Sequence, residues 1–416
     1  MGLFVLCMQS GAQDTDEPVF LDMSGAWDYA IVERSDWRRY ENGKYVGLVR
    51  NEVRASVISQ PESDSENAAR DNGGNSTFYH GNFFVLQSTL RDMRQSAQPV
   101  DAIIPVSFEL MRNGSVEIED DRGFPMMRGF PFFINKWITR GDKWAAPGKR
   151  AVDPLNTGQV IVIPFTAEYE YRGVEYFGGM LVHRVRALYG YSYRNPVSMH
   201  PYAGAMGKHK VDILIRVADG FPVHMRDDLN ITYTLADRST VEFRGFTLTF
   251  NTSIMPLDRG AVMESLEGAL GIETPKATAG GSTPVKLIPG LQNSAIDLEP
   301  VPEGIKLTIK NIQFIADSPQ FLPSELARLD LLAQALRTIP DRTFLVEGHT
   351  ASTGQAANEM QLSVERALSI INEMVKRGIG ADRFIYKGWG GTRPIGDNAT
   401  DSGRSANRRV EITILE

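Results

Sequence analysis

The stretch EGHTASTGQAANEMQLSVERA, residues 347–367, contains the residues whose types and spacing most suggest ligand chemistry. Arg366 provides a guanidinium, which can hold a carboxylate through two parallel, charge-assisted hydrogen bonds. It follows a Gly-His-Thr sequence at 348–350 and a short polar connection. This pattern is typical of a ligand-binding motif, and it predicts binding rather than catalysis.

The other reactive side chains do not form an arrangement that predicts an enzyme. The sequence has no GxSxG elbow and no Walker loop. Its six histidines show no HExxH spacing; they are His80, His183, His200, His209, His224 and His349. The acidic pair Glu168 and Glu170 and the acidic group at 117–121 are interpreted as solvated surface. We therefore expect no catalytic residue, no metal site and no cofactor, unless a deep pocket holds facing carboxylates or a histidine beside an acid.

The composition is that of an ordinary globular chain. Its 416 residues are enough for two to four domains, and 42% hydrophobic residues can fill sizeable cores. The net charge of −7, without a basic segment, argues against a nucleic-acid partner. No apolar run approaches about 20 residues, so no membrane-spanning helix is expected. Cys7 is the only cysteine, which excludes a disulfide within the chain.

The N-terminus, MGLFVLCMQSGAQDTDEP at 1–18, is interpreted as a signal-like, flexible segment. A short apolar run precedes small residues at 10–12, which would suit cleavage before Gln13, although a positively charged leader is missing. Two alternatives are that Cys7 carries a lipid and that the segment is a frayed cytosolic terminus. A chain that loses Cys7 by cleavage is compatible with export.

Residues 19–270 are predicted to be rich in antiparallel strands, in a sandwich-like or barrel-like arrangement. We expect two β-rich domains, 19–120 and 121–270, which could also form one unit. Within 165–177, three apolar positions alternate with charged ones, which indicates one buried and one wet face. Within 240–250 the apolar positions change parity at Gly245, which predicts a β-bulge there.

Residues 121–154 are unusually rich in Phe, Trp, Gly and Pro, with scattered Arg and Lys. One interpretation is an exposed aromatic and basic surface for a glycan or a protein partner. The favoured interpretation is a long loop whose aromatic side chains close the end of the β structure, because large aromatic side chains are usually buried.

A Gly-, Pro- and Thr-rich linker at 271–299 precedes a part of different character. Helical spacing of apolar residues predicts one helix over 324–339 and another over 360–378. Strands are expected at 306–314, 343–349, 384–390 and the C-terminus. Strands separated by helices indicate that residues 300–416 form an α/β sandwich.

Residues 300–416 resemble the OmpA-like C-terminal domain, a peptidoglycan-binding module of bacterial envelopes. Five landmarks occur in the order and spacing of that family: IQFIADSPQFLPSEL, EGHT-x-STG, LSVERA, GIGADRFIYKGWGGTRPIGDN and GRSANRRVEI. We identify no resemblance for the first 260 residues. The resemblance implies a protein of the cell envelope that is not an enzyme and lies in the periplasm or in association with the outer membrane.

The resemblance also implies where the module would hold its ligand, a peptidoglycan stem peptide with a diamino acid. In the family, an Asp directly after Gly-His-Thr holds the ammonium group, and the Arg of LSxxRA holds the carboxylate. Arg366 is present here, but Ala351 replaces the Asp, and Glu359 replaces an Asn three residues before Leu-Ser. Further binding residues carried over from the family are Thr350, Asn407 and Arg408, with Phe314 and Asp317 as candidate groove residues.

Three hypotheses follow. In the first, the chain is a non-enzymatic envelope protein in which Ala351 and Glu359 weaken or abolish peptidoglycan binding, and the β-rich region meets an envelope protein or a glycan. In the second, Glu359 or Asp317 replaces the missing Asp, and the chain is a working peptidoglycan tether between the outer membrane region and the cell wall. In the third, an envelope enzyme has an unrecognised site within 19–260.

Overall fold

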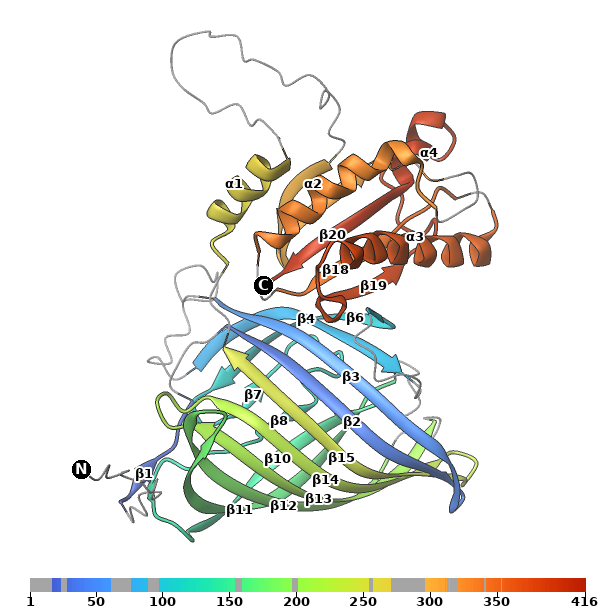
Figure 1. The fold of residues 1–416 in the computed structure, drawn as a ribbon. Coiled ribbons are helices and arrows are strands. Elements are labelled where there is room, and N and C mark those ends of the chain that lie inside the picture. The colour runs from blue at the N-terminus through green and yellow to red at the C-terminus, as the bar shows by residue number, and fades with distance from the viewer. Residues whose placement is uncertain are drawn as a thin grey trace, which may run out of the picture. The chain divides into compact units, whose positions relative to one another are not determined.

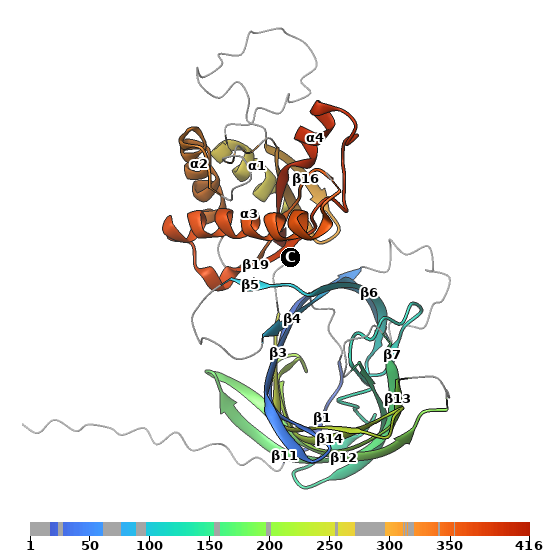
Figure 2. The same ribbon diagram turned by 90° about the vertical axis from the view of Figure 1, so that its right-hand side faces the viewer.

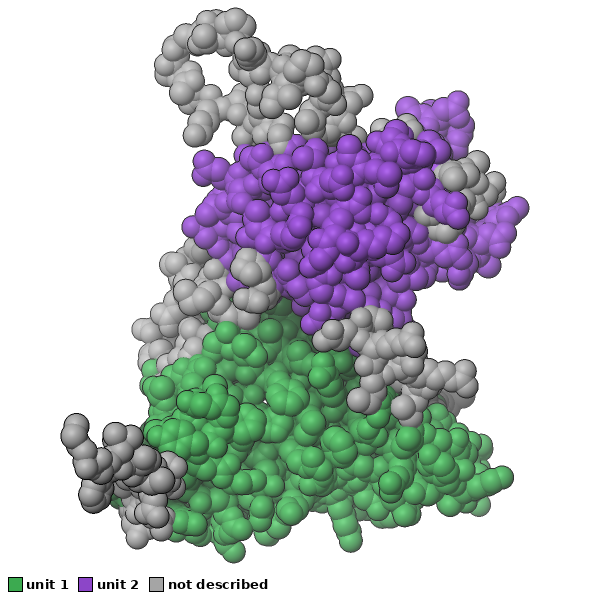
Figure 3. Space-filling view, viewed as in Figure 1, with its two compact units in different colours: residues 1–91, 104–254 green, residues 92–103, 255–416 purple. Residues whose placement is uncertain are grey.

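A computed structural model describes residues 17–23, 28–60, 76–88, 97–153, 159–196, 201–253, 257–270, 296–310, 312, 314, 320–339, 342–352 and 354–416. Most of the signal-like segment 1–18, most of the linker 271–299 and the candidate groove residue Asp317 lie outside the described residues. The chain divides into two compact units (Figure 3). Unit 1 comprises residues 1–91 and 104–254, and unit 2 comprises residues 92–103 and 255–416.

Unit 1 is built on one 12-stranded sheet, in the order β7-β6-β4-β3-β2-β15-β14-β13-β12-β11-β10-β8. Its strands are β2 (Tyr29–Glu41), β3 (Lys44–Gln60), β4 (Ser76–Ser88), β6 (Ala102–Met111), β7 (Val116–Glu117), β8 (Met127–Arg128), β10 (Lys143–Val152), β11 (Ile161–Phe177), β12 (Met180–Arg194), β13 (Tyr202–Arg216), β14 (Pro222–Leu235) and β15 (Thr240–Ser253). A separate antiparallel pair joins β1 (Val19–Phe20) to β9 (Trp137–Ile138).

The sheet of unit 1 is antiparallel and curves into a nearly closed, barrel-like form (Figures 1 and 2). It ends in the two-residue strands β7 and β8, and its longest strands, β3 and β11, have 17 residues each. The prediction of a β-rich, antiparallel N-terminal region is confirmed. Strands from both sides of residue 120 lie in this one sheet.

The inner face of the sheet is apolar because side chains alternate between faces along each strand. In β11, Ala167, Tyr169 and Tyr171 are buried as the alternation predicts, and Glu168 lies on the exposed face. The same alternation in β10 buries Trp144 beside Tyr169, with the two rings stacked at 5.2 Å. The core of unit 1 therefore lies inside the curved sheet.

The predicted bulge at Gly245 is wrong. Pairing of β15 with β14 and with β2 passes through Gly245 without a register shift, so that Gly245 lies opposite Leu229 and Trp37. Val241 and Phe243 are buried, whereas Phe246 is on the other face of the strand. The glycine instead permits close approach of β2, because a Cβ atom at this position would lie 2.1 Å from the carbonyl oxygen of Asp36.

The aromatic side chains of segment 121–154 contribute to the core, as the favoured interpretation predicts, but the prediction of one long loop is wrong, because Lys143–Val152 form strand β10 of the sheet. Phe130, Phe133 and Trp144 are buried in one cluster with Phe165 and other inner-face residues. Trp137 differs from them, since 69% of its surface is exposed.

Unit 2 contains a six-stranded mixed sheet in the order β16-β17-β20-β18-β19-β5. Its strands are β16 (Ile296–Val301), β17 (Gly304–Lys310), β18 (Phe344–Gly348), β19 (Phe384–Gly388), β20 (Arg409–Leu415) and β5 (Gln98–Pro99). Strand β18 is parallel to β19 and antiparallel to β20. The edge strand β5 comes from a distant part of the sequence and pairs in parallel with β19, which the sequence did not predict.

The helices in the described part of unit 2 are α1 (Arg259–Leu270), α2 (Leu326–Arg337), α3 (Ala356–Lys376) and α4 (Asp401–Asn407), together with the 3₁₀ turns η2 (Pro323–Glu325) and η3 (Ala381–Arg383). Helices α1, α2 and α3 share one apolar core with the sheet through residues such as Leu266, Leu332, Ile370 and Ile412. The predicted α/β sandwich is confirmed, although α3 begins four residues before the predicted start. Among the described residues, no helix combines the length and apolar character needed to cross a membrane.

Candidate functional site

The motif at 347–367 runs from the end of β18 into α3. The parallel strands β18 and β19 end side by side at Gly348 and Gly388, so the loops that follow meet at one edge of the sheet. Trp389 donates its backbone N–H to the carbonyl of Gly348 (3.0 Å), and Thr350 donates to the carbonyl of Gly390 (2.9 Å). The loop after each strand is thereby fixed to the other.

Arg366 lies on α3 with only 8% of its surface exposed. Its guanidinium carbon is 4.7 Å from the centre of the Phe314 ring, a cation–π contact that orients the side chain. The Phe314 ring in turn contacts that of Phe321 at 4.7 Å and packs against the core of unit 2. Phe314 therefore combines core packing with support of Arg366.

Ala351 is buried, with 5% of its surface exposed, and its methyl group offers no hydrogen-bonding atom. The neighbouring Thr350 is buried too, and its hydroxyl has no hydrogen-bond partner among the residues that the structure describes. The family's anion position is thus occupied by a small apolar side chain next to an unsatisfied hydroxyl.

Glu359 lies in the first turn of α3, with 8% of its surface exposed. One carboxylate oxygen accepts a hydrogen bond from the backbone N–H of Gln355, the residue that caps the helix (3.2 Å). Unsatisfied N–H groups at a helix N-terminus favour a negative side chain in this place. The other oxygen lies beside Gly391, so close that a Cβ atom added to this glycine would be 2.9 Å from it.

Asn407 uses its whole side-chain amide inside the module. Its Oδ1 accepts hydrogen bonds from the N–H groups of Ile395 and Gly396, both at 2.8 Å. Its Nδ2 donates to the carbonyl of Gly396 (2.9 Å) and to Oδ1 of Asn398 (2.8 Å). This geometry gives Asn407 a structural role in holding the loop at 395–398.

The two arginines after Asn407 lie in different surroundings. Arg408 is exposed. Arg409 is buried in β20, donates to Glu411 at 2.5 Å and to the carbonyl of Arg393 at 3.1 Å. The site residue Asp317 falls outside the described part of the chain, so its place relative to Arg366 stays a prediction.

Trp389 belongs to the same edge and is not among the residues selected from the sequence. Its indole N–H donates to Glu347 at 2.7 Å, and the guanidinium of Arg393 lies over its ring at 3.4 Å. His349, next to this pair, is buried, and burial lowers its pKa to about 3, so the imidazole is neutral at physiological pH. In the sequence, the tryptophan within GWGG was the signal that could have identified Trp389 as a candidate site residue.

Unit 1 contains a buried histidine beside an acid, the arrangement that would favour an enzyme. Nδ1 of His209 lies 2.9 Å from Asp227, and the guanidinium of Arg150 binds both Asp227 and the hydroxyl of Tyr189 at 3.1 Å. However, none of these four residues lines the cavity of unit 1 that is described below. Within the described ranges, no group of three or more His, Cys, Asp or Glu could hold a metal ion.

Comparison with known proteins identifies relatives of unit 2. Residues 313–408 match the OmpA family, and no family matches the N-terminal region. Over 138 residues the chain is 34% identical to outer membrane protein A of Bordetella avium, covering 32% of this chain and 71% of that protein.

Two further comparisons concern shorter matches. The peptidoglycan-binding protein ArfA of Mycobacterium tuberculosis is 35% identical over 103 residues, which is 25% of this chain and 32% of that protein. The chain therefore spans about a third of the length of this relative. A solved outer membrane protein of Borrelia burgdorferi B31 is 35% identical, covering 30% of this chain and all of that one, with a TM-score of 0.25.

Proposed function

Because this chain belongs to the OmpA family, we propose that it is a non-enzymatic protein of the bacterial cell envelope whose C-terminal module binds peptidoglycan weakly or not at all. The observation that carries the proposal is the pair Arg366 and Ala351. Arg366 keeps the group that would hold the carboxylate of a diamino acid, whereas Ala351 provides nothing for the ammonium. The module thus has one half of a two-point site.

The loss of the anion has a calculable effect on affinity. A hydrogen bond to a charged group contributes about 1.5–3 kcal/mol. Its absence should weaken binding roughly tenfold to hundredfold. The ligand's ammonium would also lose water on entering the site without gaining a partner, which adds to the cost.

The geometry of Glu359 favours this proposal over a working tether. One of its oxygens already accepts the Gln355 N–H at the start of α3, so the carboxylate has a helix-capping role. An ammonium could still reach the other oxygen, which lies at Gly391, but the same carboxylate would then have to serve both the helix start and the ligand. The tether hypothesis, with Glu359 or Asp317 as the replacement anion, is therefore the second candidate.

Binding to purified sacculi tests the proposal with the full-length chain at physiological salt. Ala351→Asp should tighten binding roughly tenfold to hundredfold. Ala351→Asn, similar in size but uncharged, should bind as the wild-type chain does. Strong wild-type binding that Ala351→Asp does not improve would overturn the proposal, and loss of such binding in Glu359→Gln would establish the tether instead.

The non-enzymatic part of the proposal is supported by where His209 and Asp227 lie. The His209 side chain is completely buried, burial lowers its pKa, and the pair is not part of the cavity wall. The names of the relatives support location at the outer membrane, and location in the periplasm is the other part of this proposal. Fractionation of the producing cell tests both.

A further inference from the structure

Unit 1 has a partly open cavity of about 130 Å³ inside the curved sheet. Its walls come mainly from β2, β3, β4, β6, β7, β14, β15 and residues 124–131 of the aromatic segment. An engineered apolar cavity of about 150 Å³ in another protein holds benzene, so this space suits a ligand of similar size.

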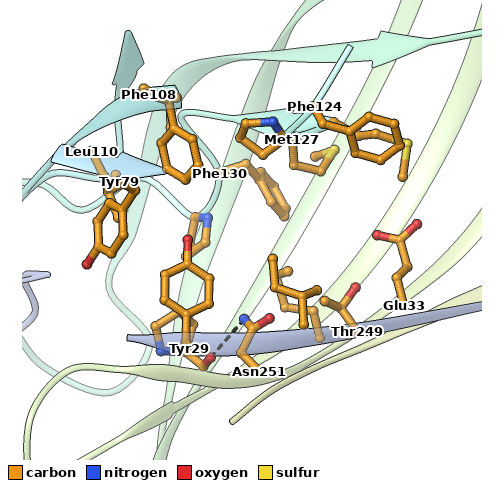
Figure 4. Close-up of a pocket in the computed structure, with 18 of the residues that line it drawn as sticks. Tyr29, Glu33, Tyr79, Phe108, Leu110, Phe124, Met127, Phe130, Thr249 and Asn251 are labelled. Carbon is orange, nitrogen blue, oxygen red and sulfur yellow. Dashed lines mark hydrogen bonds between the residues drawn. The ribbon is translucent and has the colours of Figure 1, made fainter. Parts of the chain in front are cut away.

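Aromatic side chains dominate one side of the cavity (Figure 4). The rings of Tyr29 and Tyr79 are 5.4 Å apart, and Phe108 stacks on Tyr79 at 5.5 Å. Phe124 contributes a further ring, which contacts Phe83 at 4.7 Å. The faces of aromatic rings carry partial negative charge and attract cations, most strongly where water is excluded.

Glu33 is the only charged residue among the described residues that line this cavity. Its carboxylate points from β2 into the space facing Phe124 and Met127 (Figure 4). It makes no hydrogen bond or ion pair with any residue that the structure describes, although Thr249 lines the same wall. Glu33 is half-buried, and an acid taken even partly out of water without a partner is costly, so such groups are usually paired.

The nearby cation does not supply the missing partner. Arg150 is the positive group whose charge lowers the pKa of Glu33, but its guanidinium is bound to Asp227 and Tyr189. His209 also faces Asp227, and burial lowers its pKa, so it is neutral at physiological pH. When Glu33 is ionised, this buried group therefore has one negative charge without a counter-charge.

We propose that the cavity of unit 1 binds a small organic cation, with its ammonium group against the Glu33 carboxylate and its apolar body against the aromatic side chains. Charge and shape both support this class of ligand. The uncompensated carboxylate attracts the cation, the aromatic side chains accommodate the apolar body, and the volume limits that body to about the size of one ring. This site is separate from the peptidoglycan motif and does not depend on its function.

The test uses two probes of nearly equal size, benzylamine as the cation and benzyl alcohol as the neutral analogue. Calorimetric titration of the full-length chain at pH 8 should show that benzylamine binds roughly tenfold to hundredfold more tightly. Equal affinity for the two probes, or no binding of either, would overturn the proposal. This comparison needs no variant, so it stands even if a substitution impairs folding.

Two variants on β2 then test whether Glu33 is the residue that causes the preference for benzylamine over benzyl alcohol. Glu33→Gln should reduce the preference for benzylamine to about that for benzyl alcohol, while the alcohol still binds. Glu41→Gln, on the exposed end of the same β2 strand, is the matched control and should keep the full preference. A folded Glu33→Gln variant that retains the preference would rule out the assigned contact.

Discussion

The side-chain carboxylate of Glu359 accepts a hydrogen bond from the backbone N–H of Gln355, at 3.2 Å. This contact places an acid that the family pattern does not contain at the first turn of α3. It supports a local structural role for Glu359, in which the negative charge stabilises the helix start. That role separates the effect of Glu359 on folding from its effect on ligand binding.

Glu359→Gln should therefore lower the free energy of unfolding of unit 2 by about 0.5–1 kcal/mol, since the charge at the helix N-terminus is lost. It should not reduce binding to sacculi. Chemical unfolding together with a sacculus pull-down measures both effects. Glu365→Gln, further along α3 and hydrogen-bonded only to the exposed Gln361 amide, is the control. A fall in sacculus binding would contradict the capping role.

Asn407→Ala should destabilise unit 2 by about 2–4 kcal/mol, because it leaves two backbone N–H groups and a carbonyl without their partner. Asn407→Asp should be less harmful, since it keeps the acceptor atoms for Ile395 and Gly396. Urea unfolding measures these differences. Arg408→Ala, which removes an exposed side chain, should change stability by less than about 0.5 kcal/mol. An effect of Asn407→Ala as small as that would refute the structural role.

The half-buried Glu33 should make unit 1 less stable as the pH rises from about 4.5 to about 7. Burial raises the pKa of Glu33 to about 7, from its ordinary value of 4.5, so the folded state holds this proton more tightly than the unfolded chain. Arg150 partly offsets the shift, and Asp227 adds to it. Stabilisation is present below the unfolded pKa and is lost as the pH passes the folded pKa.

The loss should amount to about 1–3 kcal/mol, at about 1.4 kcal/mol per pKa unit. Urea unfolding at pH 5 and pH 8, followed by tryptophan fluorescence, measures it, because every tryptophan except Trp389 belongs to unit 1. Glu33→Gln should reduce this pH dependence, and Glu41→Gln should leave it unchanged. An unaltered pH profile in Glu33→Gln would show that another group is responsible.

Binding of a cation in the cavity should depend on the same titration of Glu33, but its affinity should rise with pH where the stability falls. Benzylamine affinity is expected to fall as the pH decreases through about 7, because protonation of Glu33 removes the counter-charge. Benzyl alcohol affinity should stay nearly constant. Calorimetric titrations at pH 6 and pH 8 compare the two probes. A parallel pH dependence for both probes would point to a change in the cavity itself rather than in Glu33.

Lys387→Ala should loosen the edge strand β5. The ammonium of Lys387 donates to the carbonyls of Val100 (2.9 Å) and Asp101 (2.7 Å), and the Val100 N–H donates to Tyr386 (2.8 Å). Loss of the charged donor should accelerate hydrogen exchange at Val100 about tenfold. Lys376→Ala, an exposed lysine on α3, should have no effect there. Unchanged exchange would show that strand pairing alone holds β5.

Features that depend on local pattern could be predicted from the order of the amino acids. The landmarks between 313 and 408 identified the family, and helical spacing of apolar residues predicted α2 and α3 to within a few residues. Alternation along β11 predicted its buried face correctly. These features could be predicted because hydrophobic periodicity and motif spacing act over a few turns or one strand.

How distant segments meet could not be predicted from local pattern and is seen only in the folded chain. Strand β2 lies beside β15, and Ser35 contacts Thr247 at 3.0 Å across more than 200 residues of sequence. That pairing turns Glu33 inward and keeps Gly245 in regular register rather than in a bulge. Likewise β5 joins β19 from the other half of the chain. The pairing of distant strands also decides that Glu33 faces the cavity without an ion-pair partner among the described residues. The apolar periodicity of a single strand does not contain that information.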